Sequence, residues 1–351
     1  MKKLAYSTLH GYGGDRIFAG PAAPGFGGAH LADGLLRDAF AARGVECHTP
    51  DMLPPGEFDG FFFRDMPRRD DPFFRYAIDA GKPMFLHVWE NPFIHRPNAD
   101  HARFRDFARV FSLFDDDVRL RGCVKLNYAL PLAPPPADGG IPFGRRKLAC
   151  MVSSLVKKNR PGCCSFMRLG TIRFYERFHP EDFDLWGANW GKGSPALLHR
   201  PAAFAALQAL GIGRLLPRER HPCWRGECAD KAAAAGACRF SYCYENSVKL
   251  PGYVTEKLFD AISAGAVPVY MAHPSDAAAL PQGCFVDRAA FRDDAELHRF
   301  LASMPRERWE EYREEGRRFM ASDAARRFSF KAYVDTLVSG IAPVLAGAGA
   351  A

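Results

Sequence analysis

The chain has 351 residues and a net charge of +7, with 48% apolar and 25% charged residues. This length exceeds what one hydrophobic core usually serves, so we expect two domains of a soluble globular protein. Lysine and arginine are interleaved with acidic residues rather than gathered in one stripe, which argues against a nucleic-acid-binding protein. A mild positive excess suits an anionic ligand such as a diphosphate.

The N-terminal segment Met1–Ser7 carries two lysines with no apolar run behind them, so we expect no signal peptide. No apolar stretch approaches the roughly 18 residues that a membrane span requires. These features predict a cytoplasmic protein without a membrane span, and they leave peripheral association with a membrane open.

The ten cysteines show no repeated Cys-x-x-Cys pattern, and in a cytoplasmic protein we expect them to stay reduced. The densest group is His221, Cys223, Cys228 and Cys238. A zinc site there remains an alternative to ordinary thiols, although the Cys-x4-Cys spacing is loose.

The first 130 residues alternate between strand and helix patterns. Predicted strands are Lys3–Thr8, Phe58–Phe63 and Pro83–Val88, and predicted helices are Ala29–Arg43 and Phe73–Ala80. The consecutive residues Phe61, Phe62 and Phe63 indicate a buried strand. This β-α-β rhythm predicts a doubly wound, mostly parallel sheet.

A Pro- and Gly-rich segment, Pro131–Gly140, predicts a domain boundary. After it the rhythm restarts, with predicted strands Lys147–Val152, Phe183–Trp186, Phe240–Tyr244 and Val267–Met271, and predicted helices Ser165–Arg177, Pro201–Leu210, Thr255–Ala264 and Arg306–Phe319. We therefore expect α/β domains at residues 1–135 and 145–310, and a C-terminal helix and tail at residues 311–351. Two such domains imply a cleft, with ligands outside the carboxyl ends of the strands.

The most informative segment follows the strand that ends at Tyr244. A helix begins near Thr255, a good N-cap residue. The amide groups of its first turn, together with Lys257, favour an anion such as a diphosphate. Glu256 can accept hydrogen bonds from ribose hydroxyls, and Tyr253 can pack on a base or sugar. An exposed Glu–Lys pair on an ordinary helix is the alternative interpretation.

The segment resembles the donor-binding motif of the α-1,3/1,4-fucosyltransferase family (glycosyltransferase family 10), of the soluble bacterial type. That motif has an aromatic-Glu-Asn-Ser strand end followed by Tyr-Val-Thr-Glu-Lys, which appear here as Tyr244–Ser247 and Tyr253–Lys257. The resemblance implies that the GDP-sugar donor is bound by Asn246, Tyr253, Glu256 and Lys257.

A second resemblance lies in the N-terminal half. The segment Phe85–Pro92 looks like the family's strand that ends in Glu-Asn, and Phe111–Asp115 looks like the next strand of the family. The resemblance implies that Glu90 is the general base that takes a proton from the acceptor hydroxyl. A loop carboxylate that caps a turn is the alternative interpretation.

A third resemblance concerns an arginine. Val152–Ser154 and the following helix look like the family's Ser-Asn strand and the arginine that contacts the diphosphate, although Ser154 stands where the family usually has Asn. The number of residues between the arginine and the segment Asp184–Gly187 favours Arg168 as the residue that contacts the diphosphate. An insertion before the helix leaves the alignment with the family's sequence open, so Arg173 is the alternative candidate for this role.

The resemblance implies a GT-B fold, in which two Rossmann-like doubly wound domains face a cleft. It implies inverting transfer of L-fucose from GDP-β-L-fucose to an oligosaccharide acceptor, in α-1,3 or α-1,4 linkage to GlcNAc or Glc. By analogy with soluble bacterial relatives, the acceptor is a lipopolysaccharide or capsule glycan. The alternatives are a GT-B transferase that uses another nucleotide sugar, such as GDP-mannose, and a non-catalytic nucleotide-sugar binding protein.

We expect no tightly bound cofactor and no fixed metal, although a divalent cation can stimulate turnover. The residues Asp115, Asp116 and Asp117 contain the Asp-x-Asp pattern with which glycosyltransferases of another fold hold a metal. They follow a predicted strand away from the predicted diphosphate site, so we interpret them as a solvated loop.

Overall fold

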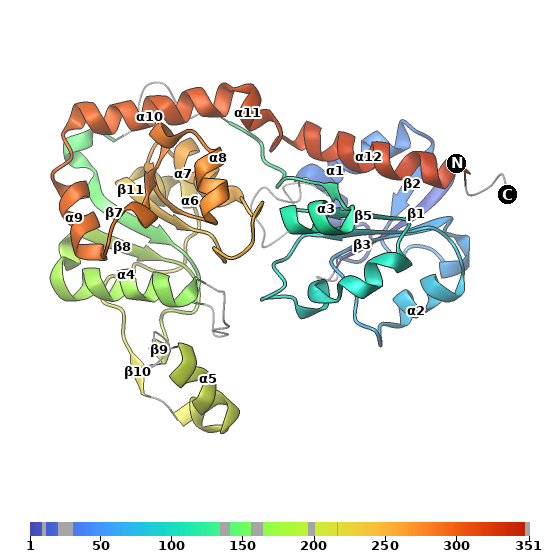
Figure 1. Ribbon diagram of the computed structural model, residues 1–351, viewed down its shortest axis with the longest axis horizontal. Helices are drawn as coiled ribbons and strands as arrows, with labels where there is room; N and C mark the ends of the chain where they lie inside the picture. The colour runs from blue at the N-terminus through green and yellow to red at the C-terminus, as the bar shows by residue number, and fades with distance from the viewer. Residues whose placement is uncertain are drawn as a thin grey trace. The chain divides into compact units, whose positions relative to one another are not determined.

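The computed structural model describes residues 1–8, 12–19, 31–133, 141–155, 164–195, 201–215 and 217–347. Its contacts divide the chain into two compact units (Figure 1). The first unit comprises Met1–Pro131 and Arg326–Ala351, and the second comprises Leu132–Ala325. The predicted boundary segment begins where the units divide, and its residues 134–140 lie outside the described ranges.

The first unit is built on a six-stranded sheet in the order β2-β1-β3-β4-β5-β6, and every pair of neighbours is parallel. Its strands are β1 (Lys2–Thr8), β2 (Val45–His48), β3 (Gly60–Arg64), β4 (Met84–Val88), β5 (Arg109–Ser112) and β6 (Val124–Lys125). Its helices are α1 (Leu31–Ala41), α2 (Pro72–Asp79), α3 (Asp115–Arg121) and α12 (Phe330–Gly347). The expected doubly wound parallel sheet is confirmed, with its topological switch point between β1 and β3.

The phenylalanines of β3 divide between the two faces of this sheet, as the two-residue period of a strand requires. Phe62 packs in the core that α1 and α12 share with the sheet. Phe61 and Phe63 contact the rings of Phe73 and Phe74 at the start of α2 on the opposite face. All three residues of the run are buried, which confirms the predicted strand.

The predicted C-terminal segment, residues 311–351, does not form a separate helix and tail. Its last helix, α12, belongs to the first unit, because Leu337, Ile341 and Leu345 are buried in the core of the first sheet. A Cβ at Gly340 would lie 2.6 Å from Phe111 of β5, so glycine permits this close approach. The chain therefore returns to its N-terminal unit at its end.

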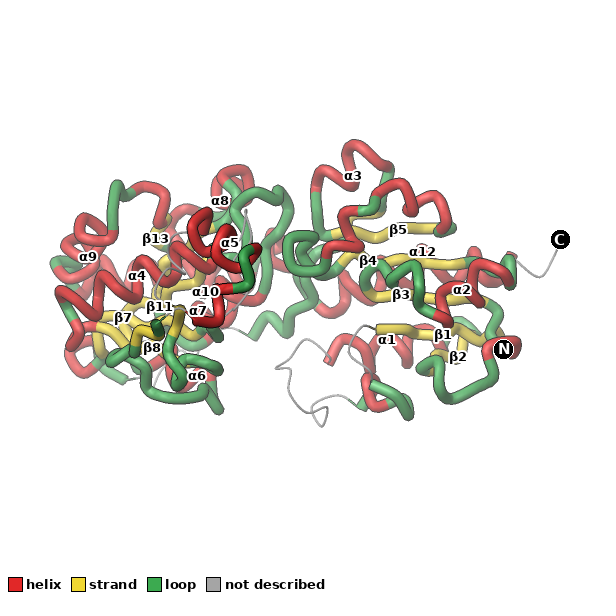
Figure 2. Tube along the Cα trace, turned by 90° about the horizontal axis from the view of Figure 1, so that it is seen from below, coloured by secondary structure: helices red, strands yellow, loops and turns green. Residues whose placement is uncertain are grey.

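The second unit holds a five-stranded parallel sheet in the order β13-β12-β11-β7-β8. Its strands are β7 (Lys147–Val152), β8 (Phe183–Trp186), β11 (Cys238–Tyr244), β12 (Val267–Met271) and β13 (Val286–Asp287), and a separate antiparallel pair is formed by β9 (Ser194–Pro195) and β10 (Arg218–Glu219). Its helices are α4 (Ser165–Phe178), α5 (Pro201–Ala209), α6 (Lys231–Gly236), α7 (Glu256–Ser263), α8 (Pro274–Ala279), α9 (Asp294–Ala302), α10 (Arg306–Ala321) and α11 (Asp323–Arg326). In each unit, helices and loops surround a layer of strands (Figure 2). The switch point of this sheet lies between β7 and β11.

The Asp-rich segment is not the solvated loop that we expected. It begins α3, and Asp117 is buried, where it accepts a hydrogen bond from Ser112 (2.7 Å) and pairs with Arg121 (3.0 Å). Carboxylates in the first turn of a helix are favoured by the helix dipole, which explains why three of them start this one.

None of the described helices is both long and apolar enough to cross a membrane.

Candidate active site

A hollow opens at the switch point of the second sheet. The carboxyl ends of β7 and β11 form its floor, and side chains of α4, α6 and α7 line it. In open α/β sheets the helices that follow the two switch-point strands leave toward opposite faces, and ligands bind in the crevice between them. The hollow therefore lies where a parallel sheet of this topology binds its ligand.

Arg168 lines this hollow from the first turns of α4. Its guanidinium is buried and donates to the carbonyl oxygen of Tyr244 (2.5 Å) and to the side-chain oxygen of Asn246 (3.0 Å). These bonds hold the cation against the end of β11. Arg173 instead forms an ion pair with Glu219 and does not line the hollow.

Glu245 holds the loop after β11 to the start of α7. Its carboxylate is fully buried and accepts hydrogen bonds from the backbone N–H of Thr255 (2.8 Å), the hydroxyl of Thr255 (2.7 Å) and the hydroxyl of Tyr270 (3.0 Å). A buried carboxylate needs this many donors to offset its lost hydration. Our sequence analysis did not select Glu245, although a carboxylate directly after a buried strand was the available signal.

Thr255 is the N-cap residue of α7, as predicted, but its side chain makes no cap hydrogen bond to that helix. Its hydroxyl donates to Glu245 instead. The fixed position of the helix start therefore comes from the preceding strand end and not from the usual side-chain cap.

Lys257 and Glu256 line the hollow at the first turn of α7. The ammonium of Lys257 donates to the hydroxyl of Thr255 (2.8 Å) and lies 3.3 Å from Glu256 and 3.4 Å from Glu245. Burial by itself would lower the pKa of Lys257, but the charges of Glu256 and Glu245 raise it above its ordinary value.

Burial and a neighbouring charge also have opposite effects on the pKa of Glu256. Burial by itself would raise its pKa, but the charge of Lys257 and the N–H of its own backbone bring the pKa below the ordinary value. Lys257 and Glu256 are therefore both ionised near pH 7, and an incoming diphosphate would have to compete with carboxylates for the ammonium group.

Asn246 and Tyr253 lie behind Arg168 rather than among the residues that line the hollow. Asn246 accepts from Arg168, and its amide nitrogen is 3.4 Å from the hydroxyl of Tyr253. The ring of Tyr253 is buried, so in this structure it is not presented to a base or sugar as we had expected. The two residues orient the arginine.

Glu90 belongs to the first unit, where it follows β4. Its backbone N–H and that of Trp89 both donate to one carboxylate oxygen of Asp65 (2.7 and 2.8 Å). Asp65 itself has a positive φ of 68° and also accepts from Asn98 (2.7 Å). The half-buried side chain of Glu90 accepts from the backbone N–H of Asn91 (2.8 Å). Asp65, which our sequence analysis did not select, thus fixes the loop that carries Glu90.

A buried polar cluster lies at the switch point of the first sheet, next to that loop. Arg64 pairs with Asp33, donates to the hydroxyls of Tyr6 and Tyr333, and has its guanidinium carbon 5.0 Å from the ring centre of Trp89. Burial by itself would lower the pKa of Arg64, but Asp33 raises it well above its ordinary value. The ring of Trp89 therefore packs against a buried, charged guanidinium that is itself held by hydrogen bonds.

The alternative zinc group of the sequence analysis does not form among the described residues. His221 instead contacts Glu176 (3.1 Å) and Ser194 (2.9 Å). Within those residues, the spacing of a metal-ligand group is found at His179, Asp182 and His298.

Comparison with known proteins gives a family and a fold. Residues 220–319 match the model of "Glycosyltransferase family 10 (fucosyltransferase) C-term", a segment that contains Lys257 but neither Arg168 nor Glu90. No curated protein matches the chain in sequence.

Solved structures match almost the whole chain. An alpha-glucosyltransferase (AGT) in complex with UDP has a TM-score of 0.54 and 11% identity, over 98% of this chain and 100% of that one. An alpha1,3-fucosyltransferase has a TM-score of 0.52 and 14% identity, over 98% and 90%. Anabaena Alr3699/HepE in complex with UDP and glucose has a TM-score of 0.55 and 14% identity, over 98% and 100%.

At these identities the structural matches establish the fold, which is GT-B with two Rossmann-like sheets. The family model covers the segment in which Glu245 positions the start of α7 and Lys257 lines the hollow. Residues 220–319 therefore match the C-terminal region of glycosyltransferase family 10, and the chain has the GT-B fold of the solved glycosyltransferases.

Proposed function

We propose that the chain transfers L-fucose from GDP-β-L-fucose to a hydroxyl of an oligosaccharide acceptor, with inversion at the anomeric carbon. The observation that carries this proposal is the hollow at the second switch point, where Arg168 and Lys257 meet beside the first turn of α7. Two cations and a helix N-terminus suit a diphosphate. A solved alpha1,3-fucosyltransferase with GDP-fucose shares the fold, with a TM-score of 0.51.

The donor assignment gives each residue a role. Arg168 and Lys257 contact the diphosphate and stabilise the negative charge that builds on GDP as the glycosidic bond breaks. Glu256 accepts from the ribose hydroxyls. Asn246 accepts a hydrogen bond from the guanidinium of Arg168 and donates one to the hydroxyl of Tyr253, so the two residues together hold the arginine in place. No tightly bound cofactor is part of this mechanism, and a divalent cation would act only by assisting charge neutralisation.

Glu90 is the proposed general base. It deprotonates the acceptor hydroxyl, which then attacks the anomeric carbon in line with the departing GDP. No covalent enzyme intermediate is needed, because inversion requires only one displacement. The half-buried rings of Trp89 and Tyr128, whose centres are 4.4 Å apart, lie in the same unit and offer an apolar surface to a sugar ring of the acceptor.

We further propose that the acceptor is a bacterial lipopolysaccharide or capsule glycan that ends in GlcNAc or Glc and is modified by α-1,3 or α-1,4 linkage in the cytoplasm. This part rests on the resemblance to soluble bacterial members of the family. Peripheral attachment to the membrane would bring the chain close to such acceptors.

The first test is calorimetric titration of the purified chain with GDP, UDP and ADP. Selective binding of GDP supports the donor assignment and leads to assays of GDP-fucose with glycans that end in GlcNAc or Glc, with the anomeric configuration of the product read by NMR. A preference for UDP would overturn the assignment in favour of a donor like that in the solved alpha-glucosyltransferase complex. GDP-mannose serves as a competing donor in the same assay.

A non-catalytic sugar-nucleotide binding protein is the remaining alternative. Such a protein would bind GDP-fucose without releasing GDP in the presence of any acceptor. GDP release that depends on an acceptor and on Glu90 separates the two functions.

A further inference from the structure

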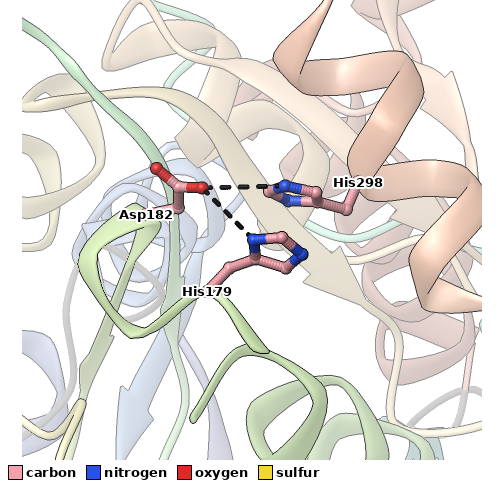
Figure 3. A group of neighbouring side chains, drawn as sticks. All are labelled: His179, Asp182 and His298. Atoms are coloured by element: carbon pink, nitrogen blue, oxygen red, sulfur yellow. Dashed lines mark ion pairs between the residues drawn. The ribbon is translucent and has the colours of Figure 1, made fainter. Parts of the chain in front are cut away.

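A second candidate site lies in the same unit as the hollow, near the amino end of β8. Two imidazoles and one carboxylate face one another there, from His179 at the end of α4, Asp182 just before β8, and His298 on α9 (Figure 3). One potential ligand atom from each of the three side chains lies within 4.8 Å of the others. These are the side-chain types that bind divalent transition metals.

The distances within this group are too long for hydrogen bonds and short enough for a shared ion. Nε2 of His298 lies 3.7 Å from the carboxylate of Asp182, and Nδ1 of His179 lies 4.0 Å from the same oxygen. Two ligands bound about 2.0–2.2 Å from one tetrahedral ion are roughly 3.4 Å apart. A small rotation of the partly exposed side chains of His179 and Asp182 would bring the three groups closer to that spacing.

His298 gives an independent reason to expect a ligand. Its side chain is only 8% exposed, and its Nδ1 has no hydrogen-bond partner among the described residues. Its Nε2 faces Asp182 beyond hydrogen-bond distance. Buried polar groups are normally paired, so a ring that lies against Phe174 and Tyr175 with its Nδ1 unpaired is unusual.

The imidazoles of His179 and His298 stack with their ring centres 3.6 Å apart, which places both rings beside the carboxylate of Asp182.

We propose that His179, Asp182 and His298 bind one divalent transition-metal ion, such as Zn²⁺ or Co²⁺, with water completing its coordination. Nitrogen ligands select this class over Mg²⁺ and Ca²⁺, which prefer oxygen ligands. The ion joins the end of α4 to α9, which are already connected by a hydrogen bond from Thr171 to Asp294 (3.1 Å).

The position of the group assigns the ion a structural role and separates it from sugar transfer. Asp182 precedes β8, whereas the hollow lies at the carboxyl ends of the parallel strands. His179 is eleven residues beyond Arg168 on α4, which corresponds to about 16 Å along a helix. The proposal is therefore independent of the donor and acceptor assignments.

The test uses the full chain, stripped of metal with a chelator, in a Cys228→Ser background, because Cys228 is a partly exposed thiol that could bind the same ions. Calorimetric titration with Zn²⁺, and the visible absorption of added Co²⁺, should report one ion per chain. Excess Mg²⁺ should not compete. Free Zn²⁺ at about 100 times its Kd should raise the melting temperature of the second unit by about 5–10 °C.

The key variants are Asp182→Asn and His179→Ala, because both side chains are partly exposed and their loss should not disturb folding. Each should weaken Zn²⁺ binding by at least about tenfold and abolish the gain in melting temperature. The matched control, His273→Ala, removes an imidazole elsewhere in the same unit and should retain both effects.

Zn²⁺ binding that survives both variants, or that never exceeds weak binding of the kind any surface imidazole shows, would overturn the proposal. GDP affinity should be the same with and without Zn²⁺. If GDP binding required the ion and still did so in Asp182→Asn, the ion would belong to the nucleotide, and the proposed site would be wrong.

Discussion

At the scale of single residues, the second unit places two cations where the sheet topology predicts an anion site. Arg168 and Lys257 come from two different helices, yet both line the same hollow. Each already has protein acceptors, namely Asn246 for the arginine and Glu245 with Glu256 for the lysine. The cations are therefore held in position before any ligand binds, which reduces the entropy cost of binding.

Lys257→Met should weaken GDP binding by about 10–150-fold, the equivalent of one charge-assisted hydrogen bond of roughly 1.5–3 kcal/mol. Calorimetric titration measures this directly. Arg173→Met is the matched control, because Arg173 carries a charge in the same unit but pairs with Glu219 outside the hollow. Equal losses in the two variants would show that net charge, and not position, determines affinity.

Glu90→Gln should lower the rate of sugar transfer by about 10²–10⁴-fold, the usual contribution of a general base, and leave GDP affinity unchanged. The amide keeps the shape of the side chain but cannot accept a proton. Steady-state transfer and GDP titration are measured on the same preparation. Glu57→Gln, an exposed carboxylate of the same unit that pairs with Lys3, should behave as wild type, and a Glu90→Gln enzyme with normal turnover would remove Glu90 as the base.

At the scale of elements, loops after strands acquire their shape from buried carboxylates. Asp65 accepts the N–H groups of the loop after β4, and Glu245 accepts those at the start of α7. In both places a carboxylate directly follows a parallel strand. It accepts hydrogen bonds from backbone N–H groups that have no partner within the sheet. The two loops carry the residues that we propose for acceptor activation and donor binding.

Glu245→Gln should destabilise the second unit by about 1–3 kcal/mol, because the new amide donors face the N–H and hydroxyl groups that the carboxylate accepts. We also expect weaker GDP binding, since the start of α7 would shift with Lys257. Thermal unfolding and GDP titration measure the two effects. The control is Glu219→Gln, which removes a more exposed ion pair of the kind that contributes about 0–1 kcal/mol; comparable destabilisation of both variants would contradict the positioning role.

At the scale of the whole molecule, the chain leaves the first unit near Pro131 and returns to it at Arg326. The returning helix, α12, supplies several of the buried apolar residues of the first core and places Tyr333 in the cluster around Arg64. The N-terminal unit is therefore complete only after the last segment of the chain has been synthesised.

Leu337→Ala should destabilise the first unit by about 2–5 kcal/mol, the cost of a buried leucine cavity, although the substitution lies near the C-terminus. GDP binding should be retained, because the hollow is formed wholly by the second unit. Differential scanning calorimetry with and without GDP can assign each transition to a unit. Leu35→Ala, on the exposed side of α1, is the control, and loss of GDP binding in Leu337→Ala would contradict the division into units.

The sequence by itself determined the elements with the strongest local patterns. The β7, β8 and β12 strands occur at the predicted residues, because short apolar runs between polar or glycine-rich segments leave little freedom in where a buried strand begins and ends. The motif around Lys257 could also be recognised from the sequence, since its two parts, Tyr244–Ser247 and Tyr253–Lys257, lie close together along the chain. The resemblance to the family and the α/β class followed from these local features.

Only the tertiary structure decided which distant residues meet. Sequence spacing favoured Arg168 but left Arg173 open, because the choice depends on which side of α4 faces β11. It could not assign α12 to the first unit or bring His298 to His179 and Asp182, since these contacts join segments more than a hundred residues apart. It also could not show that Tyr253 is buried behind an arginine, because burial depends on neighbours that the local sequence does not contain.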